Sequence, residues 1–241
     1  MIKKFLKRVF RKSAKTKTVG NAQVIPFDVH GVARTSLSYG ANKVCDGLQA
    51  AGFEAYVVGG AVRDLLLAKT PKDFDVATNA TPEEVRRVFR RSRIIGRRFR
   101  LVHVMFGEEV VEVSTFRRMI EAEDAQTDAH GRLLRDNEFG DQEQDAARRD
   151  FTANALFYDP ATQEIFDFHH GYADTQNGVL RMIGDPLVRY REDPVRMLRA
   201  VRLSAKLGMK LDAATAAPIV KMKDLLANVP EARMFDEMLK L

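Results

Sequence analysis

The chain has 241 residues, of which 45% are hydrophobic and 30% charged, a composition typical of a globular protein with one large or two small domains. It contains no apolar run of 18 residues, so no membrane span is predicted, and its one cysteine, Cys45, excludes an internal disulfide and favours a reducing cytoplasm. The net charge of +6 is uneven: residues 1–20 and 86–100 each carry eight Lys or Arg and no acid, whereas residues 121–145 carry nine acids. This segregation favours a face that binds polyanions over a uniformly charged surface.

Residues 1–30 are predicted to form a basic and mostly disordered leader. Within residues 1–12, the apolar side chains fall on one face of a helix and the Lys and Arg side chains on the other. That pattern is compatible with weak contact to a membrane surface or to an RNA backbone. An isolated helix of this length is marginal in water, so disorder is the preferred expectation.

The middle of the chain alternates between helical and extended patterns. A first helix is predicted over residues 37–51 and ends at Gly52. A second begins at residue 61, and a third follows the cap formed by Thr81 and Pro82. Strands are predicted over residues 54–58, 73–78, 93–98, 101–106 and 110–115.

The rest of the chain is predicted to be a long polar loop followed by helices. Residues 117–145 have a composition typical of functional or disordered loops, and from about residue 185 the pattern is helical and free of strands. The final segment, residues 231–241, has an apolar stripe without a C-cap, so we expect either a truncated chain or a stripe that packs on a partner. The sequence therefore predicts an α/β front and an all-α back.

Asp73 and Asp75 are the residues that say most about function. On a strand, carboxylates two residues apart share a face, and their repulsion is costly unless a cation lies between them. Oxygen ligands favour a hard ion such as Mg²⁺, which often binds carboxylates together with substrate phosphates. Upstream, Gly59 and Gly60 lie between a strand and a helix, where free backbone N–H groups can bind phosphate. These features predict nucleotide chemistry.

Arg63 follows the glycine pair in the first turn of the predicted helix. A guanidinium there could bind a phosphate through two hydrogen bonds. The alternative is a structural pair with its neighbour Asp64.

Three motifs in order resemble the class II nucleotidyltransferases, which comprise bacterial poly(A) polymerases and CCA-adding tRNA nucleotidyltransferases. They are residues 59–67 (GGAVRDLLL) with Asp73 and Asp75, residues 148–156 (RRDFTANAL), and residues 192–202 (EDPVRMLRAVR). Ala68 departs from the family, which normally has glycine there, and we expect this to alter a turn without changing the chemistry.

The resemblance implies an α+β or α/β fold with a palm-like mixed sheet and flanking helices in a head domain over residues 31–158. An all-α neck or nucleotide-recognition region, apparently truncated, would follow over residues 159–241. It also implies template-independent addition of nucleotides to RNA 3′ ends, with ATP and RNA as partners and two Mg²⁺ ions on Asp73 and Asp75. Neither a stable protein partner nor an oligomeric state can be predicted.

Carry-over from the family assigns roles to further residues. Asp150 would complete a catalytic carboxylate triad, although an Asp at the start of a helix is commonly a cap. Glu112, on a neighbouring strand, is a rival for the third carboxylate. The family's nucleotide-binding positions correspond to Gly59, Gly60, Arg63, Arg149, Asp193, Arg196, Arg199 and Arg202.

Asp193 and Arg196 match the pair that reads the edge of the incoming base in the family. Arg presents donors and Asp presents acceptors, so a fixed pair can match such an edge. The alternative for these helical charges, at spacings of three and four residues, is an ordinary salt-bridge ladder.

The segment 94–104 resembles the poly(A) polymerase branch of the family. Its Arg97, Arg98 and Arg100 suit an RNA held through phosphate without a fixed sequence, whereas His103 is expected to be a core or hydrogen-bonded residue. Polyadenylation is the preferred function. CCA addition to tRNA and a truncated remnant that binds RNA or ATP without catalysis are the alternatives.

Overall fold

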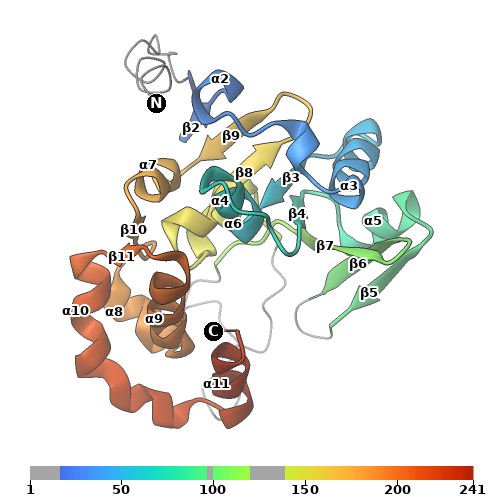
Figure 1. Ribbon diagram of the computed structural model, residues 1–241. Coiled ribbons are helices and arrows are strands. Elements are labelled where there is room, and N and C mark those ends of the chain that lie inside the picture. Colours follow the sequence, from blue (N-terminus) through green and yellow to red (C-terminus); the bar gives the residue numbers. More distant parts are fainter. Residues whose placement is uncertain (1–16, 97–99, 120–138, 241) are drawn as a thin grey trace.

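The centre of the protein is a nine-stranded mixed sheet, seen in a computed structural model that describes residues 17–96, 100–119 and 139–240. The strand order is β1-β2-β9-β8-β3-β4-β7-β6-β5, and Figure 1 shows the sheet spanning the upper part of the molecule. This mixed sheet with flanking helices confirms the predicted fold class. Its strands are β1 (Lys17–Val19), β2 (Ala22–Ile25), β3 (Ala55–Val58), β4 (Asp75–Thr78), β5 (Ser92–Ile95), β6 (Leu101–Phe106), β7 (Glu109–Thr115), β8 (Leu156–Asp159) and β9 (Glu164–Asp167).

One pair of strands brings the predicted site residues Asp75 and Glu112 together. Strands β4 and β7 are parallel, whereas the other pairs in the sheet are antiparallel. Their register sets Asp75 opposite Glu112, and the next pair sets Glu112 opposite His103. Residues directly opposite each other share a face, so the three side chains form a polar row across the sheet.

Helices cover the sheet and begin where the sequence provides caps. The Ser38 hydroxyl accepts from the Ala41 N–H at the start of α3, and Thr81 and Glu84 form a reciprocal capping box at α5. Val44, Val76 and Val113 belong to the large apolar core that α3, α4 and α5 share with the sheet. These head helices are α2 (Phe27–His30), α3 (Tyr39–Ala50), α4 (Gly60–Leu66), α5 (Pro82–Val88), α6 (Gln142–Arg148) and α7 (Gly171–Gln176), with 3₁₀ turns at Arg34–Ser36 and Thr152–Asn154.

The C-terminal helices form a second layer, at the lower left of Figure 1. They have their own core, in which Phe151, Tyr190, Met197 and Leu203 are buried. Helices dominate the C-terminal part as predicted, with two differences: a short parallel pair joins β10 (Val179–Leu180) to β11 (Lys210–Leu211), and β9 of the head sheet lies within the range 159–241 that was predicted to be all-α. The helices are α8 (Pro186–Glu192), α9 (Val195–Leu207), α10 (Ala213–Met222), a 3₁₀ segment (Lys223–Asn228) and α11 (Glu231–Met238).

Two sequence predictions are wrong in their extent. Residues 17–30 are not part of a disordered leader, because β1 and β2 add to the sheet edge through β9 and α2 follows them. The predicted strand 73–78 begins only at Asp75, so Asp73 lies in the preceding loop. Residues 1–16, with the predicted amphipathic stretch 1–12, lie outside the described residues. Among the described residues, no helix is long and apolar enough to cross a bilayer.

The predicted loop over residues 117–145 also differs in part. Residues 120–138 lie outside the described ranges, but α6 begins at Gln142 with a capping box from Asp141. Strands β8 and β9 and helix α7 were not predicted. β8 is buried on both faces, which removes the alternation by which half-buried strands are recognised.

Ala68 occupies the turn after α4 with a φ of 56°, in the left-handed region that favours glycine. The Lys69 N–H donates to the Asp64 carbonyl and closes the helix end. The turn therefore forms with alanine in place of the family's glycine, at a cost in backbone strain.

Candidate active site

The site begins at the turn between β3 and α4. Gly59 has a φ of 74°, which turns the chain sharply into Gly60 at the start of the helix. Arg63 is 7% exposed, and its guanidinium donates to Asp64 Oδ1 at 2.7 and 2.9 Å and to Asn154 Oδ1. The structural pair considered as the alternative for Arg63 is thus present, while the same side chain also lines a cavity.

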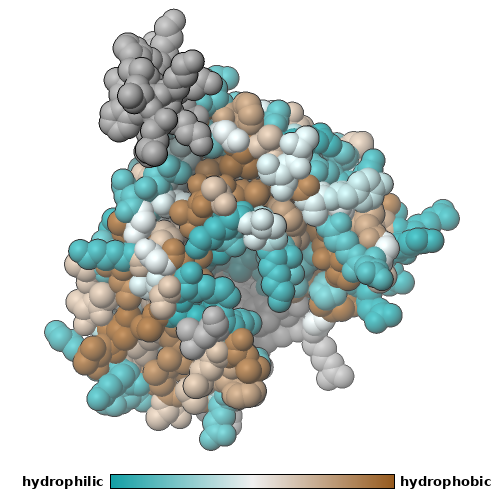
Figure 2. Space-filling view, viewed as in Figure 1, coloured by the Kyte–Doolittle hydropathy of each residue, from teal (hydrophilic) through white to brown (hydrophobic). Residues whose placement is uncertain are grey.

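That cavity has a volume of about 600 Å³ and lies between the sheet and α9. Figure 2 shows hydrophilic side chains around a hollow between the two layers. The cavity brings together residues of all three motifs, namely Gly59, Gly60, Arg63, Asp75, Arg149, Asp150, Asp193, Arg196, Arg199 and Arg202. Asp73 is not among its lining residues.

The sheet wall of the cavity carries Asp75 and Glu112. The Asp75 carboxylate makes no hydrogen bond or ion pair with any residue that the structure describes, and Glu112 contacts His103 Nε2 at 3.5 Å. Partial desolvation, then repulsion from Glu112 and Asp73, raises the pKa of Asp75 to about 6, against an opposing attraction from Arg149. Although the described residues hold no group of three ligands at metal-binding distance, this excess of negative charge is what a divalent cation would relieve.

The helical wall consists of the cavity residues from the end of α6 to α9 together with the buried acids Asp145 and Glu237 that pair with their arginines, and its charges are paired within the protein. Asp150 accepts from the Phe151 N–H and from Asn154 Nδ2, and its Oδ2 lies 2.6 Å from Arg199 Nη2. Burial raises the pKa of Asp150, but Arg199 and the hydrogen bonds outweigh it and the pKa is lowered. The structure therefore places Asp150 in the cavity with a contact to the next backbone N–H, but not as a cap, because the 3₁₀ turn begins after Phe151 without a side-chain cap hydrogen bond.

Asp193 and Arg196 lie close together but are held by other partners. Asp193 Oδ2 accepts from Arg233 of α11 at 2.9 Å. Arg196 Nη1 donates to Glu192 Oε2 at 2.8 Å, one rung of the salt-bridge ladder, and to the Arg189 carbonyl. Both the ladder and the shared lining of the cavity are therefore present.

The two remaining arginines of the third motif meet a buried acid from α11. Glu237 is 6% exposed, and its Oε2 accepts from Arg202 Nε at 2.8 Å. Its Oε1 lies 3.7 Å from Arg199 Nη1, which links Asp150, Arg199, Glu237 and Arg202 in one chain of charges. Sequence reasoning missed Glu237, since no spacing rule connects α11 to α9.

Asp145 was also missed, although it organises the second motif. It is fully buried on α6, and its carboxylate accepts from Arg148 Nε at 2.7 Å and from Arg149 Nη2 at 2.8 Å. Its pKa is lowered because these arginines outweigh the effect of burial. The spacing of three and four residues between Asp145 and the arginines was a signal that could have revealed it.

Arg189 fixes the same segment from the other side. This side chain is 4% exposed, and its Nη2 donates to the carbonyls of Arg148 and Arg149, both at 2.7 Å. Asp145 and Arg189 together hold the side chain and backbone of Arg149, which lies beside Gly59 and contributes attraction to Asp75.

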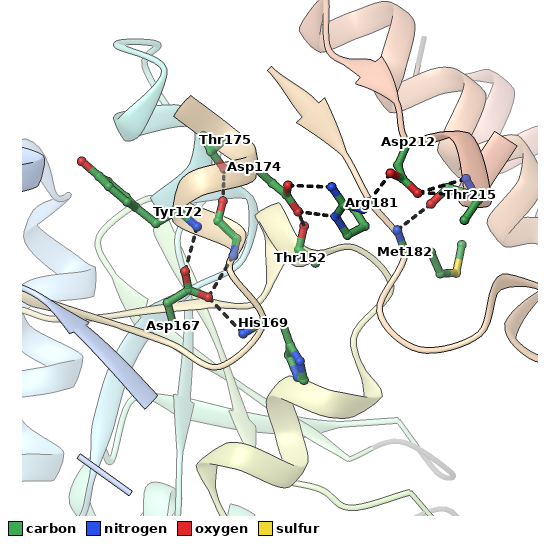
Figure 3. A network of polar contacts seen from close by, with 12 residues as sticks. Thr152, Asp167, His169, Tyr172, Asp174, Thr175, Arg181, Met182, Asp212 and Thr215 are labelled. Atoms are coloured by element: carbon green, nitrogen blue, oxygen red, sulfur yellow. Dashed lines mark hydrogen bonds and ion pairs between the residues drawn. The ribbon is translucent and has the colours of Figure 1, made fainter. Parts of the chain in front are cut away.

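A further network ties this segment to the helical layer (Figure 3). Asp174 accepts from the Thr152 hydroxyl and from Arg181, and Arg181 also donates to Asp212, the N-cap of α10. Thr215 of α10 accepts from the Met182 N–H. These contacts set the position of the 3₁₀ turn that follows Asp150.

The arginines predicted to bind RNA are only partly described. Arg97 and Arg98 lie outside the described residues. Arg100 forms an ion pair with Glu83 of α5, and its side chain does not line the cavity.

Two family models match the sequence. Residues 55–181 match the poly A polymerase head domain, and residues 208–241 match a model described as a probable RNA and SrmB-binding site of polymerase A.

Individual relatives agree with this match. The chain is 54% identical to Poly(A) polymerase I of Escherichia coli O6:H1 over 90% of this chain and 48% of the relative. It is 39% identical to the CCA-adding enzyme of Lactobacillus helveticus over 83% of this chain and 49% of the relative. The structure of the Bacillus stearothermophilus CCA-adding enzyme in complex with CTP superposes with a TM-score of 0.70 at 36% identity, covering 83% of this chain and 47% of that one. The chain thus spans about half the length of the curated relatives it matches.

Proposed function

Because the chain belongs to the poly A polymerase head-domain family, we propose that it adds AMP from ATP to RNA 3′ ends in the cytoplasm, without a template. The observation that carries the proposal is the single cavity in which the residues of all three motifs meet. The higher identity to Poly(A) polymerase I than to the CCA-adding enzymes supports polyadenylation over CCA addition.

Asp73, Asp75 and Glu112 are the residues that would hold Mg²⁺. Asp75 and Glu112 face each other on parallel strands, and the pKa of Asp75 is raised first by desolvation and then by repulsion from Glu112. When bound, such ions activate the attacking hydroxyl and neutralise the leaving pyrophosphate. Glu112 is a better candidate for the third carboxylate than Asp150, because Asp150 is already paired with Arg199.

The remaining cavity residues would bind and orient the nucleotide. The backbone at Gly59 and Gly60, together with Arg63 and Arg149, presents positive charge to a triphosphate. Because the phosphoryl group needs little covalent help, the contribution of these side chains is positioning and charge neutralisation.

Asp193 and Arg196 would read the base edge. Each now has a protein partner, Arg233 and Glu192 respectively, so binding a base requires that these contacts be shared or exchanged. Their donors and acceptors then replace the template that such a reaction lacks.

The test is incorporation of each nucleoside triphosphate, added separately with Mg²⁺, onto a short unstructured RNA. Long products with ATP alone are expected. Addition limited to C, C and A on tRNA would favour the CCA-adding alternative, and RNA binding without incorporation would favour a non-catalytic remnant.

A matched pair of variants tests the carboxylate assignment. Asp75→Asn is expected to lower extension by at least about a hundredfold, the scale of losing a key electrostatic group in an active site. Asp28→Asn, an exposed acid on α2, should leave extension unchanged. Activity retained in Asp75→Asn would contradict the metal assignment.

A further inference from the structure

A second cavity of about 700 Å³ lies at the opposite end of the sheet from the C-terminal helices. It is lined by the end of α5, the segment that leads into β5, the β6–β7 turn and the first residue of α3. In Figure 1 this region is the right-hand flank of the molecule, where Figure 2 shows hydrophilic side chains projecting beside hydrophobic surface. None of the site residues discussed above lines this cavity.

Three aromatic rings form a row along this cavity. Phe106 makes edge-to-face contacts with Tyr39 at 6.1 Å and with Phe89 at 6.4 Å between ring centroids. Phe89 is seated closely against Gly47 of α3, where a Cβ would come within 2.7 Å of its ring. Tyr39, by contrast, is 67% exposed. The row is therefore anchored in the core at one end and open to solvent at the other.

The same cavity is strongly basic. Arg87, Arg90 and Arg91 line it, all are exposed, and no acidic residue belongs to the lining. Lys43 Nζ lies 5.6 Å from the centroid of the Tyr39 ring. The nearby acid Glu109 is turned onto the start of α3, where its carboxylate accepts from the Gly40 N–H at 2.9 Å. The carboxylate of Glu109 is thus already held by the backbone.

Stacking faces interleaved with arginines are what an unstructured single strand of nucleic acid needs. Bases stack on aromatic rings whatever their identity, and phosphates pair with the cations between them. A membrane surface would not use a recessed row of rings, and an acidic peptide would not need exposed stacking faces.

The strands connect this cavity to the carboxylates of the first one. β7 begins at Glu109, directly after the turn that contains Gly107, and Glu112 follows three residues, or ~10 Å of strand, further on. The polar row across the sheet continues from Asp75, Glu112 and His103 to Arg93 on the edge strand β5, where the arginine is exposed. An RNA whose 3′ end lies at Asp75 would pass the exposed Arg93 on its way to the aromatic cavity.

From this geometry we propose that the cavity formed by Tyr39, Phe89, Phe106, Arg90 and Arg91 is a second binding site for single-stranded RNA. It holds nucleotides upstream of the 3′ end that the first cavity receives. This assignment rests on the proposed function for its substrate class, but it concerns binding and is tested without catalysis.

The test measures the dissociation constant of the 241-residue chain for a labelled oligo(A) RNA of ~20 nucleotides by fluorescence anisotropy, at several salt concentrations. The double variant Arg90→Glu with Arg91→Glu should weaken binding at least tenfold. Loss of two phosphate contacts should also reduce the slope of log K against log salt by about 1.4. Tyr39→Ala should weaken binding at least about fivefold without changing that slope, because stacking releases no counterions.

Arg86→Glu is the matched control, since Arg86 is exposed on α5, the helix that ends just before Arg90 and Arg91, and does not line the cavity. It should change the dissociation constant less than twofold. Equal weakening by Arg86→Glu would reduce the effect to general charge and overturn the proposal, as would variants at Arg90, Arg91 and Tyr39 that bind like the wild type.

RNA length and a catalytic variant separate this proposal from the first one. An RNA of ~4 nucleotides is too short to occupy both cavities, so the double variant should reduce the preference for the longer RNA. An undiminished preference would contradict the proposal. Asp75→Asn should abolish extension while the effects of Arg90, Arg91 and Tyr39 on binding persist. If the wild-type chain extends no RNA, these effects on binding still test whether the second cavity binds RNA.

Discussion

Along the sheet wall of the first cavity, two acids face each other with His103 and the attraction of Arg149 as partial compensation, whereas along the helical wall each acid is paired directly with an arginine. Asp75 and Glu112 oppose each other on parallel strands, and the pKa of Asp75 is raised. Asp150 and Glu237, by contrast, are joined to Arg199, and the pKa of Asp150 is lowered. Under the proposed function the difference corresponds to two tasks: the sheet wall would receive a cation, and the helical wall would receive a nucleotide.

Removing a compensated charge from the helical wall should have the largest effect on folding. Asp145→Asn leaves Arg148 and Arg149 without their buried partner, so we expect the free energy of unfolding to fall by about 3 kcal/mol. The KM for ATP should rise as Arg149 loses its fixed position. Urea denaturation and steady-state kinetics measure the two effects.

Asp141→Asn is the control for this variant, because asparagine also caps helix α6 well and the site is exposed. A stability of Asp145→Asn equal to that of Asp141→Asn would show that the helical wall does not depend on its ion pairs.

The next test concerns the acid that α11 supplies. Glu237→Gln should lower the free energy of unfolding by about 2 kcal/mol, because Arg202 and Arg199 lose a buried charged partner. Chemical denaturation measures it against Asp236→Asn, an exposed neighbour on the same helix. If both variants unfold alike, the pairing of α11 with α9 contributes little to the helical wall.

Removing an acid from the sheet wall should change the free energy of unfolding in the opposite direction from the two variants above, and the change should depend on pH. With its pKa raised to about 6 in the folded state, Asp75 favours folding at low pH, and this contribution is lost as the pH rises from about 4 to above 6. Asp75→Asn has no carboxyl group at this position, so it does not lose stability in this way as the pH rises. Its stability relative to the wild type should therefore increase by about 1 kcal/mol over that window, after allowance for solvent screening.

Denaturation in the absence of divalent ions at pH 4.5 and pH 7 measures the Asp75 effect. Mg²⁺ should reverse the sign at pH 7, because a bound cation stabilises the wild type alone. A relative stability that does not change with pH would mean that the two walls do not differ in this respect.

The smallest expected effect lies at the turn that leads towards the sheet wall. Ala68→Gly should raise the free energy of unfolding by about 0.5 kcal/mol, because relief of left-handed strain exceeds the added chain entropy. Thermal unfolding measures it. Ala51→Gly, at an exposed helix end with negative φ, should be destabilising and serves as the control.

Local patterns predicted the elements whose signals lie in neighbouring residues. The cap at Thr81 and the alternation in β6 and β7 gave elements that the structure confirms. Strand β8 was missed because burial on both faces removes alternation, and Asp73 was placed on a strand that begins two residues later.

The candidate site was predicted by motif and completed by tertiary structure. The three motifs share one cavity, as expected from the resemblance. Their supports were less visible: Asp145 acts through helical spacing that was overlooked, whereas Arg189 and Glu237 reach their partners only through the fold. A sequence shows which charges are present, and packing decides which of them are neutralised.

Asp75 and Glu112 face each other only when the parallel strands β4 and β7 pair in the correct register. Because side chains alternate along a strand, a slip of β7 by one residue would turn Glu112 to the opposite face and bring Val111 or Val113 beside Asp75. The slipped sheet would bury a carboxylate among valines, which the core does not tolerate. Molecules with the wrong register would therefore lose both the facing pair of acids that the proposed function needs and part of their stability. The same residues thus favour the correct register during folding.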